Sequence, residues 1–178
     1  MSLVAATLLA GAGLLAAGSL LWAYPPAFQR AFRAFPRSDA ATLVLLTLAT
    51  ALVLFHVSRL GEADFGKYRH LLFGFFLALS IGAWFRVPDF LGIRALSVLG
   101  LLLANVFLHA AYLEPPATRL LLVGLTYLLI PACLYLAAAP YRFRDAAETL
   151  DRSPRLRRIS GAAGAGLGVL LCLAAFTY

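Results

Sequence analysis

The chain has 178 residues, of which 62% are hydrophobic and only 13% are charged, and its mean hydropathy is +0.88. About a quarter of the residues of an ordinary soluble domain are charged, so this composition excludes that class and indicates an integral membrane protein. The net charge of +7 would also suit a nucleic-acid-binding protein. Because the basic residues lie between apolar segments, we expect anionic lipid headgroups as their partner and no nucleic acid.

The charged residues fall in five clusters and leave six uncharged stretches of roughly membrane-crossing length. A helix needs about 20 residues to cross a hydrocarbon core of about 30 Å. The third stretch is the shortest, and the apolar stems of Arg69 and Arg86 are expected to extend it. Membrane strands would alternate polar and apolar residues, which runs such as 43–46 do not. The six predicted spans are Met1 to Gln29, Ala40 to Ser58, His70 to Phe85, Ala95 to Leu113, Leu120 to Tyr141 and Ile159 to Tyr178.

The sequence therefore predicts an all-α, polytopic membrane helical bundle with six transmembrane helices in a single domain, residues 1–178. The first stretch lacks a preceding Lys or Arg, so we interpret it as a retained span and not as a secretion signal. With the N-terminus outside, the inner loops 25–39, 86–94 and 142–158 hold three, two and six Lys or Arg residues. The outer loops 59–69 and 114–119 hold three and one. This excess of positive charge predicts a multi-pass protein of the inner (plasma) membrane with both termini on the periplasmic side.

Proline, glycine and capping residues predict where the helices begin and end. Pro131 lies inside the fifth span, where it is expected to kink the helix. The charged loop 142–158 is expected to form a short helix at the inner surface. The boundary residues are Tyr24-Pro25-Pro26 after the first span, Ser38 or Asp39 before the second, Gly61 after it, Pro88-Asp89 before the fourth, Pro115-Pro116 and Thr118 before the fifth, and Ser153-Pro154 before the sixth.

Small residues recur at four-residue spacing on three of the spans and predict faces where helix backbones approach closely. Such faces either seal contacts within the bundle, which we favour, or bind another chain. Cys133 and Cys172 are expected at different depths, so we predict that they do not form a disulfide and act as small apolar fillers. The small-residue sets are Gly13 and Ala17, Gly74, Ala78 and Gly82, and Gly164 and Gly168.

The first and third inner loops resemble each other, since both follow a proline, place Phe among arginines and end in Arg-Ser. The two interpretations are a parallel internal repeat, as in some transporters, and convergence of two juxtamembrane loops on the same composition. We favour convergence.

No charged residue lies at the predicted membrane midplane, which argues against ion-coupled transport. The three histidines, His56, His70 and His109, are all expected near the outer surface. His56 and His109 could ligate a haem b iron, with Asn105 orienting His109 from one helical turn away. The three histidines with Glu114 or Asp64 could instead hold a metal ion. The ordinary alternative is that interfacial histidines simply lie at this depth.

Two charged segments complete the candidate sites. The outer-loop residues Glu62, Asp64, Lys67 and His70 could supply acid and base groups, but such residues also serve solubility alone, and we predict no catalytic residue. The third inner loop is expected to contact anionic lipid headgroups. Its lipid-contacting residues are Arg142, Arg144, Arg152, Arg155, Arg157 and Arg158.

The leading functional prediction is a non-catalytic accessory or structural subunit of a larger membrane complex, in contact with other membrane subunits or with copies of itself. It depends on the short loops, the uncharged midplane and the small-residue faces. The alternatives are a haem- or metal-binding redox anchor, and a small-solute transporter or channel shaped by Pro131.

Overall fold

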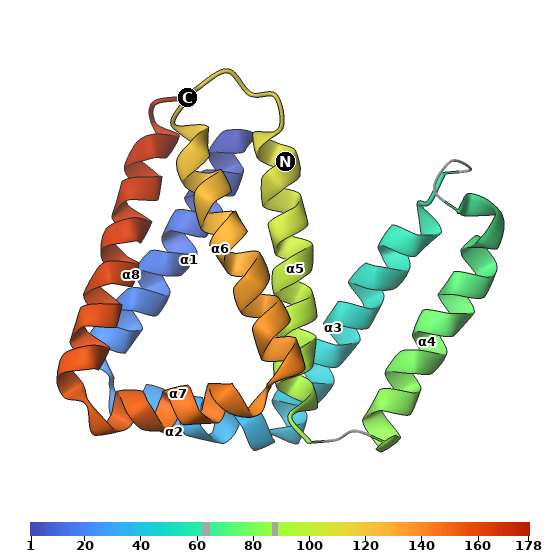
Figure 1. Ribbon diagram of the computed structural model, residues 1–178, viewed down its shortest axis with the longest axis horizontal. Coiled ribbons are helices and arrows are strands. Elements are labelled where there is room, and N and C mark those ends of the chain that lie inside the picture. The colour runs from blue at the N-terminus through green and yellow to red at the C-terminus, as the bar shows by residue number, and fades with distance from the viewer. Residues whose placement is uncertain (62–64, 87–88) are drawn as a thin grey trace.

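A computed structural model describes residues 1–61, 65–86 and 89–178, and the regular elements among these residues are all helices (Figure 1). Six helices are long and apolar enough to cross a membrane. Two shorter helices, α2 and α7, lie across one end of the molecule. The α-helices are α1 (Leu3–Ala23), α2 (Pro26–Ala34), α3 (Asp39–Ser58), α4 (Arg69–Arg86), α5 (Leu91–Ala111), α6 (Arg119–Ala138), α7 (Tyr141–Arg152) and α8 (Pro154–Ala175), with 3-10 turns η1 (Phe35–Arg37) and η3 (Gly66–Tyr68).

The six predicted spans are confirmed as helices, and most boundaries lie where the local chemistry placed them. Tyr24 ends α1 in the left-handed region at φ 44°, and Pro25 and Pro26 then start α2. The Ser38 hydroxyl caps α3 by accepting from the Ala41 amide at 3.2 Å. Helix α8 begins at Pro154, inside the basic segment, as expected for proline at the first helical position.

Three boundary predictions need correction or fall outside the described residues. Helix α3 ends at Ser58, before Gly61, and Arg59 caps it. The N-cap of α5 is Phe90 and not Asp89, with φ 57° and no side-chain cap, while Pro88 lies outside the described residues. Pro131 lies inside α6, as expected, and the kink predicted there stays a prediction.

The long helices form two pairs that converge at one end, and a hairpin that stands apart. Helices α1 and α8 pack along their length, as do α5 and α6. Around Leu3, Phe107, Leu122 and Leu171 these four helices share a buried apolar cluster, at the end that holds both chain termini. Toward the other end the pairs separate, and α2 and α7 lie between them (Figure 1).

The α1–α8 contact is a backbone-to-backbone contact formed by glycines. A Cβ atom on Gly18 would lie 2.3 Å from the Ala165 nitrogen, and one on Gly161 would lie 2.7 Å from the Trp22 nitrogen. A Cβ on Gly168 would lie 2.6 Å from the Leu15 nitrogen. Only glycine permits this approach, because any side chain would push the two backbones apart.

Both cysteines are free thiols, and each packs its sulfur against a glycine of a neighbouring helix. The Cys133 sulfur of α6 fills the space over Gly100 of α5, where an added Cβ would lie 2.5 Å from it. The Cys172 sulfur of α8 lies in the same way over Gly11 of α1, at 2.7 Å from such a Cβ. The predicted filler role is therefore confirmed.

The other small-residue faces do not pack inside the molecule. Gly13, Gly74 and Gly82 have open space where a Cβ would stand, and Ala17 and Ala78 are exposed. Internal packing was therefore the wrong expectation for these two sets, and it is confirmed only for Gly164 and Gly168. Four-residue spacing selected the wrong face of α1, whose contacting glycines, Gly11 and Gly18, are seven residues apart.

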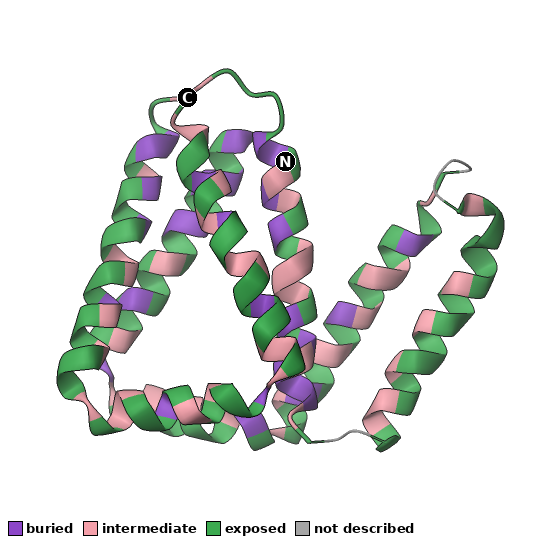
Figure 2. Cartoon of the chain, in the orientation of Figure 1, coloured by how far each residue is buried: buried purple, intermediate pink, exposed green. Residues whose placement is uncertain are grey.

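The hairpin of α3 and α4 lies at the edge of the molecule. Helix α3 packs on α5 near the end where α2 and α7 lie, and α4 packs mainly on α3. None of the α4 residues, all of which the structure describes, is buried. Figure 2 shows α4 in exposed and intermediate colours along its whole length.

Candidate functional site

The two short helices pack against each other through an aromatic cluster. The Phe32 and Phe143 rings lie 5.0 Å apart between centroids, and Phe35 and Phe143 lie 5.6 Å apart. Phe28 stacks on Phe32 at 5.6 Å. Aromatic pairs at these separations add to the stabilisation from burial alone. The two inner loops of similar sequence are therefore a matched pair of antiparallel helices, in which the end of α2 meets the start of α7.

A polar cluster around Asp151, near the end of α7, joins α7 to α2 and to the end of α1. The Asp151 carboxylate accepts hydrogen bonds from the Tyr24 hydroxyl, from Gln29 Nε2 at 3.3 Å and from Arg33 Nε at 2.5 Å. Its side chain is 11% exposed. The Arg157 guanidinium of α8 lies over the Tyr24 ring, 4.3 Å from its centroid. Residues of four helices thus meet around one half-buried carboxylate.

These contacts set the protonation states of the cluster. Burial, the largest single influence, would raise the pKa of Asp151, but hydrogen bonds from Arg33, Tyr24 and Gln29 outweigh it and hold that pKa below its ordinary value. Burial, followed by the hydrogen bond to Asp151, raises the pKa of Tyr24. The same carboxylate raises the pKa of Arg33 through its hydrogen bond. At neutral pH the cluster therefore holds an anionic Asp151 beside a cationic Arg33 and a neutral Tyr24.

A hollow of 390 Å³ opens between α2, η1 and α7, next to this cluster. Arg144 and Arg152 in its wall share Glu148, with nitrogen-to-oxygen distances of 3.8 and 3.5 Å. The hollow is lined by Arg33, Pro36, Arg37, Phe90, Arg144, Ala147, Glu148, Asp151 and Arg152.

The six arginines predicted to contact lipid headgroups lie on α7 and the first turns of α8. Arg157 differs from the others, since it is half-buried against Tyr24. Lipid contact by the exposed five stays a prediction. These five are Arg142, Arg144, Arg152, Arg155 and Arg158.

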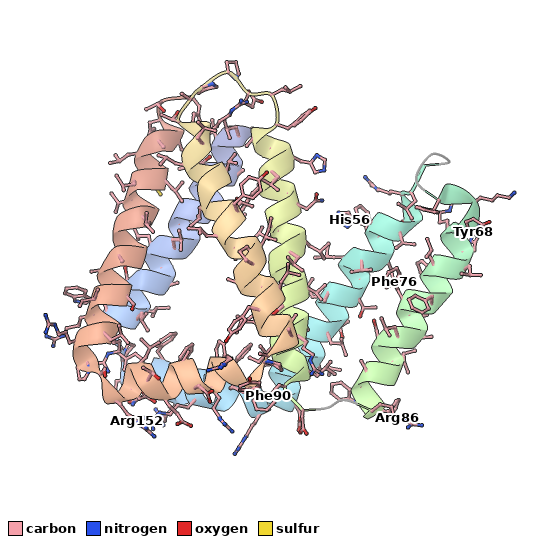
Figure 3. All side chains as sticks on the ribbon, viewed as in Figure 1. His56, Tyr68, Phe76, Arg86, Phe90 and Arg152 are labelled. Atoms are coloured by element: carbon pink, nitrogen blue, oxygen red, sulfur yellow. The ribbon has the colours of Figure 1, made fainter. Side chains whose placement is uncertain are left out.

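The histidines lie at the opposite end, each on a different helix and each exposed. His56 is near the end of α3 (Figure 3), and its Nδ1 donates to the Leu52 carbonyl at 2.8 Å, which leaves Nε2 free to accept. His109 is near the end of α5. Helices α3 and α5 diverge toward these ends (Figure 1). His70 is the second residue of α4, a helix that lies farther from α5 than α3 does.

The predicted ligand sets are not assembled among the described residues. No group of three His, Cys, Asp or Glu side chains in residues 1–61, 65–86 and 89–178 is placed to hold a metal ion. In the same part of the chain, no hydrogen bond joins Asn105 to His109. Asp64 and Glu62 lie outside the described residues, while Lys67, His70 and Glu114 are exposed. Haem or metal binding here stays a prediction.

Apolar grooves flank the α3–α4 hairpin, on either side of a single polar contact. Thr50 Oγ1 of α3 donates to Ser80 Oγ of α4 at 2.9 Å, and Ser80 Oγ donates to the Phe76 carbonyl at 2.9 Å. One groove, of 470 Å³, lies between α3 and α4 alone. The other, of 310 Å³, is also bounded by α5 and contains Arg94.

The polar cluster and the grooves were not predicted from the sequence. Among the described residues Asp151 pairs with Arg33 of α2 and with none of its own loop's arginines, and no pattern in the sequence indicates that choice. For the grooves the sequence signal was Arg94, a basic residue in the first turn of an apolar helix.

The fold and these sites define a helical protein with six membrane-length apolar helices and a charged layer at one end. The chain matches no protein-family model, no curated protein and no solved structure in comparisons of sequence and fold.

Proposed function

We propose that this protein is a non-catalytic accessory or structural subunit of a membrane complex, and that α4 is the helix on which a transmembrane helix of another subunit docks. The observation that supports this is the position of α4. It is an apolar helix of 18 residues, none of them buried, held to the rest of the chain mainly by α3.

The outward face of α4 has the composition of a helix-docking surface. Gly74, Ala78 and Gly82 repeat every four residues and so share one face. The α3 contact lies on the opposite side, at Ser80. Lipid gives no hydrophobic drive for helix association, so close backbone packing over small residues is a main source of stability. Elsewhere in this chain the same device, glycine against backbone, joins α1 to α8.

Enlarging this face tests the proposal. The double substitution Gly74→Leu, Gly82→Leu should release the partner chain during mild detergent extraction, read as loss of co-purifying protein and a smaller particle in size analysis. The matched control is Gly13→Leu, Gly166→Leu, which also adds two leucines at glycines with open space but on α1 and α8. A wild-type chain that extracts as a lone monomer would refute the proposal, as would equal retention of the partner by both variants.

The orientation and location belong to the same proposal. We place the chain in the inner membrane as a multi-pass protein, with α2 and α7 at the cytoplasmic surface and the termini in the periplasm. The excess of Lys and Arg in the segments at the α2–α7 end supports this orientation. Periplasmic and cytoplasmic reporters fused after Tyr178 would test it, and an active cytoplasmic reporter would reverse the assignment.

Neither alternative function gains support from a particular observation. A redox anchor needs converging histidines, and a transporter needs a polar path. The grooves beside α3 and α4 are apolar, and their two hydroxyls are already bonded.

A further inference from the structure

We propose that the groove between α3, α4 and α5 binds an anionic amphiphile, whose acyl chain lies against the apolar lining and whose headgroup pairs with Arg94. This inference is independent of the proposed docking of α4, because it uses the inward side of that helix and not the glycine face.

The shape of the groove suits a chain. It is 310 Å³ in volume and follows the helix axes from Ala83 and Leu91 at the α2–α7 end toward Phe76 and Val98. Its extent along α5 is about 10 Å, since each helical residue adds about 1.5 Å. Phe76 lies between α3 and α4 in Figure 3. This length covers about one third of a hydrocarbon core of about 30 Å.

The chemistry of the groove limits what it accepts. Its two hydroxyl protons are already used, because Thr50 donates to the Ser80 hydroxyl and Ser80 donates to the Phe76 carbonyl. A polar solute would lose its hydrogen bonds with water and find few replacements. The exception is the Arg94 guanidinium, which always carries its charge and presents several donors suited to a phosphate or carboxylate group.

Arg94 itself lacks a counter-charge. It is half-buried, and among the described residues no carboxylate lies within 4.0 Å of its guanidinium. It is also the fourth residue of α5, and the amino-terminal turn of a helix disfavours a cation. Arg33 and Arg144 in the α2–α7 layer differ from it, because Arg33 pairs with Asp151 and Arg144 with Glu148. An external anion would supply what Arg94 lacks, at the level where a lipid headgroup meets the acyl region.

The test is native mass spectrometry of the full chain in a non-ionic detergent, titrated with phosphatidylglycerol, phosphatidylcholine or inorganic phosphate. We expect one phosphatidylglycerol molecule to bind more tightly than phosphatidylcholine, and Arg94→Gln to weaken it about tenfold, as the loss of one charge-assisted hydrogen bond predicts. Arg86→Gln is the matched control. Arg86 ends α4 at the same end of the molecule as Arg94 of α5, but it is exposed and points out of the groove (Figure 3). Equal weakening by both variants would overturn the proposal.

A second variant tests the chain-binding part. Ala83→Phe places a ring in the groove from α4 and should displace phosphatidylglycerol even where Arg94→Gln proves unstable. Equal binding of the two lipids would refute the pairing of an anionic headgroup with Arg94. Unchanged binding in Ala83→Phe, or displacement of phosphatidylglycerol by inorganic phosphate, would refute an acyl-chain site. The last result would assign the site to a free anion. None of these outcomes affects partner retention through Gly74 and Gly82, so the two proposals fail separately.

Discussion

The α1–α8 contact makes a quantitative prediction for Gly18→Ala. The added Cβ would lie 2.3 Å from the Ala165 nitrogen, where ordinary contact needs at least 3.4 Å, so the two backbones must separate by about 1 Å. Backbone atoms cannot turn aside as a side chain does, which places the cost at the upper end of overpacking, about 3 kcal/mol. Replacing glycine inside a helix returns about 1 kcal/mol. We therefore expect Gly18→Ala to lower the free energy of unfolding by about 2 kcal/mol.

The matched control is Gly13→Ala on the same helix, where nothing lies within 4 Å of the new atom. It should leave stability unchanged or raise it by at most about 1 kcal/mol. The assay is SDS-induced unfolding in micelles, carried out in a Trp84→Phe background so that the fluorescence comes from Trp22, whose backbone lies against Gly161. Adding Gly161→Ala to Gly18→Ala should cost less than the two separate losses, because one separation of the helices relieves both clashes. Equal stability of Gly18→Ala and Gly13→Ala would refute this reasoning.

Three further predictions concern the other sites. The pKa of Asp151 is lowered in the folded protein, so the stability that its ionised carboxylate contributes is complete above about pH 4, its ordinary pKa, and is lost as the pH falls through the folded value. Asp151→Asn should therefore flatten the dependence of the unfolding free energy on pH below about pH 4. A pH dependence equal to that of the wild type would contradict this. Thr50→Val removes the hydroxyl-to-hydroxyl bond between α3 and α4 and should lower the free energy of unfolding by about 0.6 kcal/mol. Spin labels on the two helices should then report a wider spread of interhelical distances. An unchanged distance distribution would show that apolar packing alone fixes the hairpin. The wild-type protein purified from haem-supplied cells should show no Soret band. A Soret band in the wild type that is lost in both His56→Ala and His109→Ala would replace the accessory role by a redox one.

The long helices could be predicted because their determinants are local. Uncharged length, prolines and Ser38 act within a few residues of each boundary, and the six spans follow from them. The N-cap of α5, Phe90, could not be predicted from local sequence. It holds a left-handed N-cap position that Asp89 was expected to take, and no short-range pattern favours a bulky aromatic residue there.

The packing was less predictable because it depends on which helices meet. Gly13 and Gly11 are equivalent in local sequence, yet only Gly11 lies against α8. Likewise the similarity of the two inner loops was visible, but their pairing through Phe32 and Phe143 depends on a contact between residues more than a hundred positions apart. The spacing of Phe28, Phe32 and Phe35 is the signal that could have identified α2 as a helix with one aromatic face.

The pairing of the first helix with the last has a consequence for biosynthesis. Roughly 140 residues separate Gly18 from its contacts on α8, and at about 5–20 residues per second the ribosome needs about 7 to 30 s to make them. Throughout that interval the glycine face of α1 has no α8 to pack on, whereas α3 and α4 meet soon after they emerge. The α1–α8 contact can form only after α8 has been made, so a chain truncated before α8 would leave α1 as a surface for quality-control proteases to recognise.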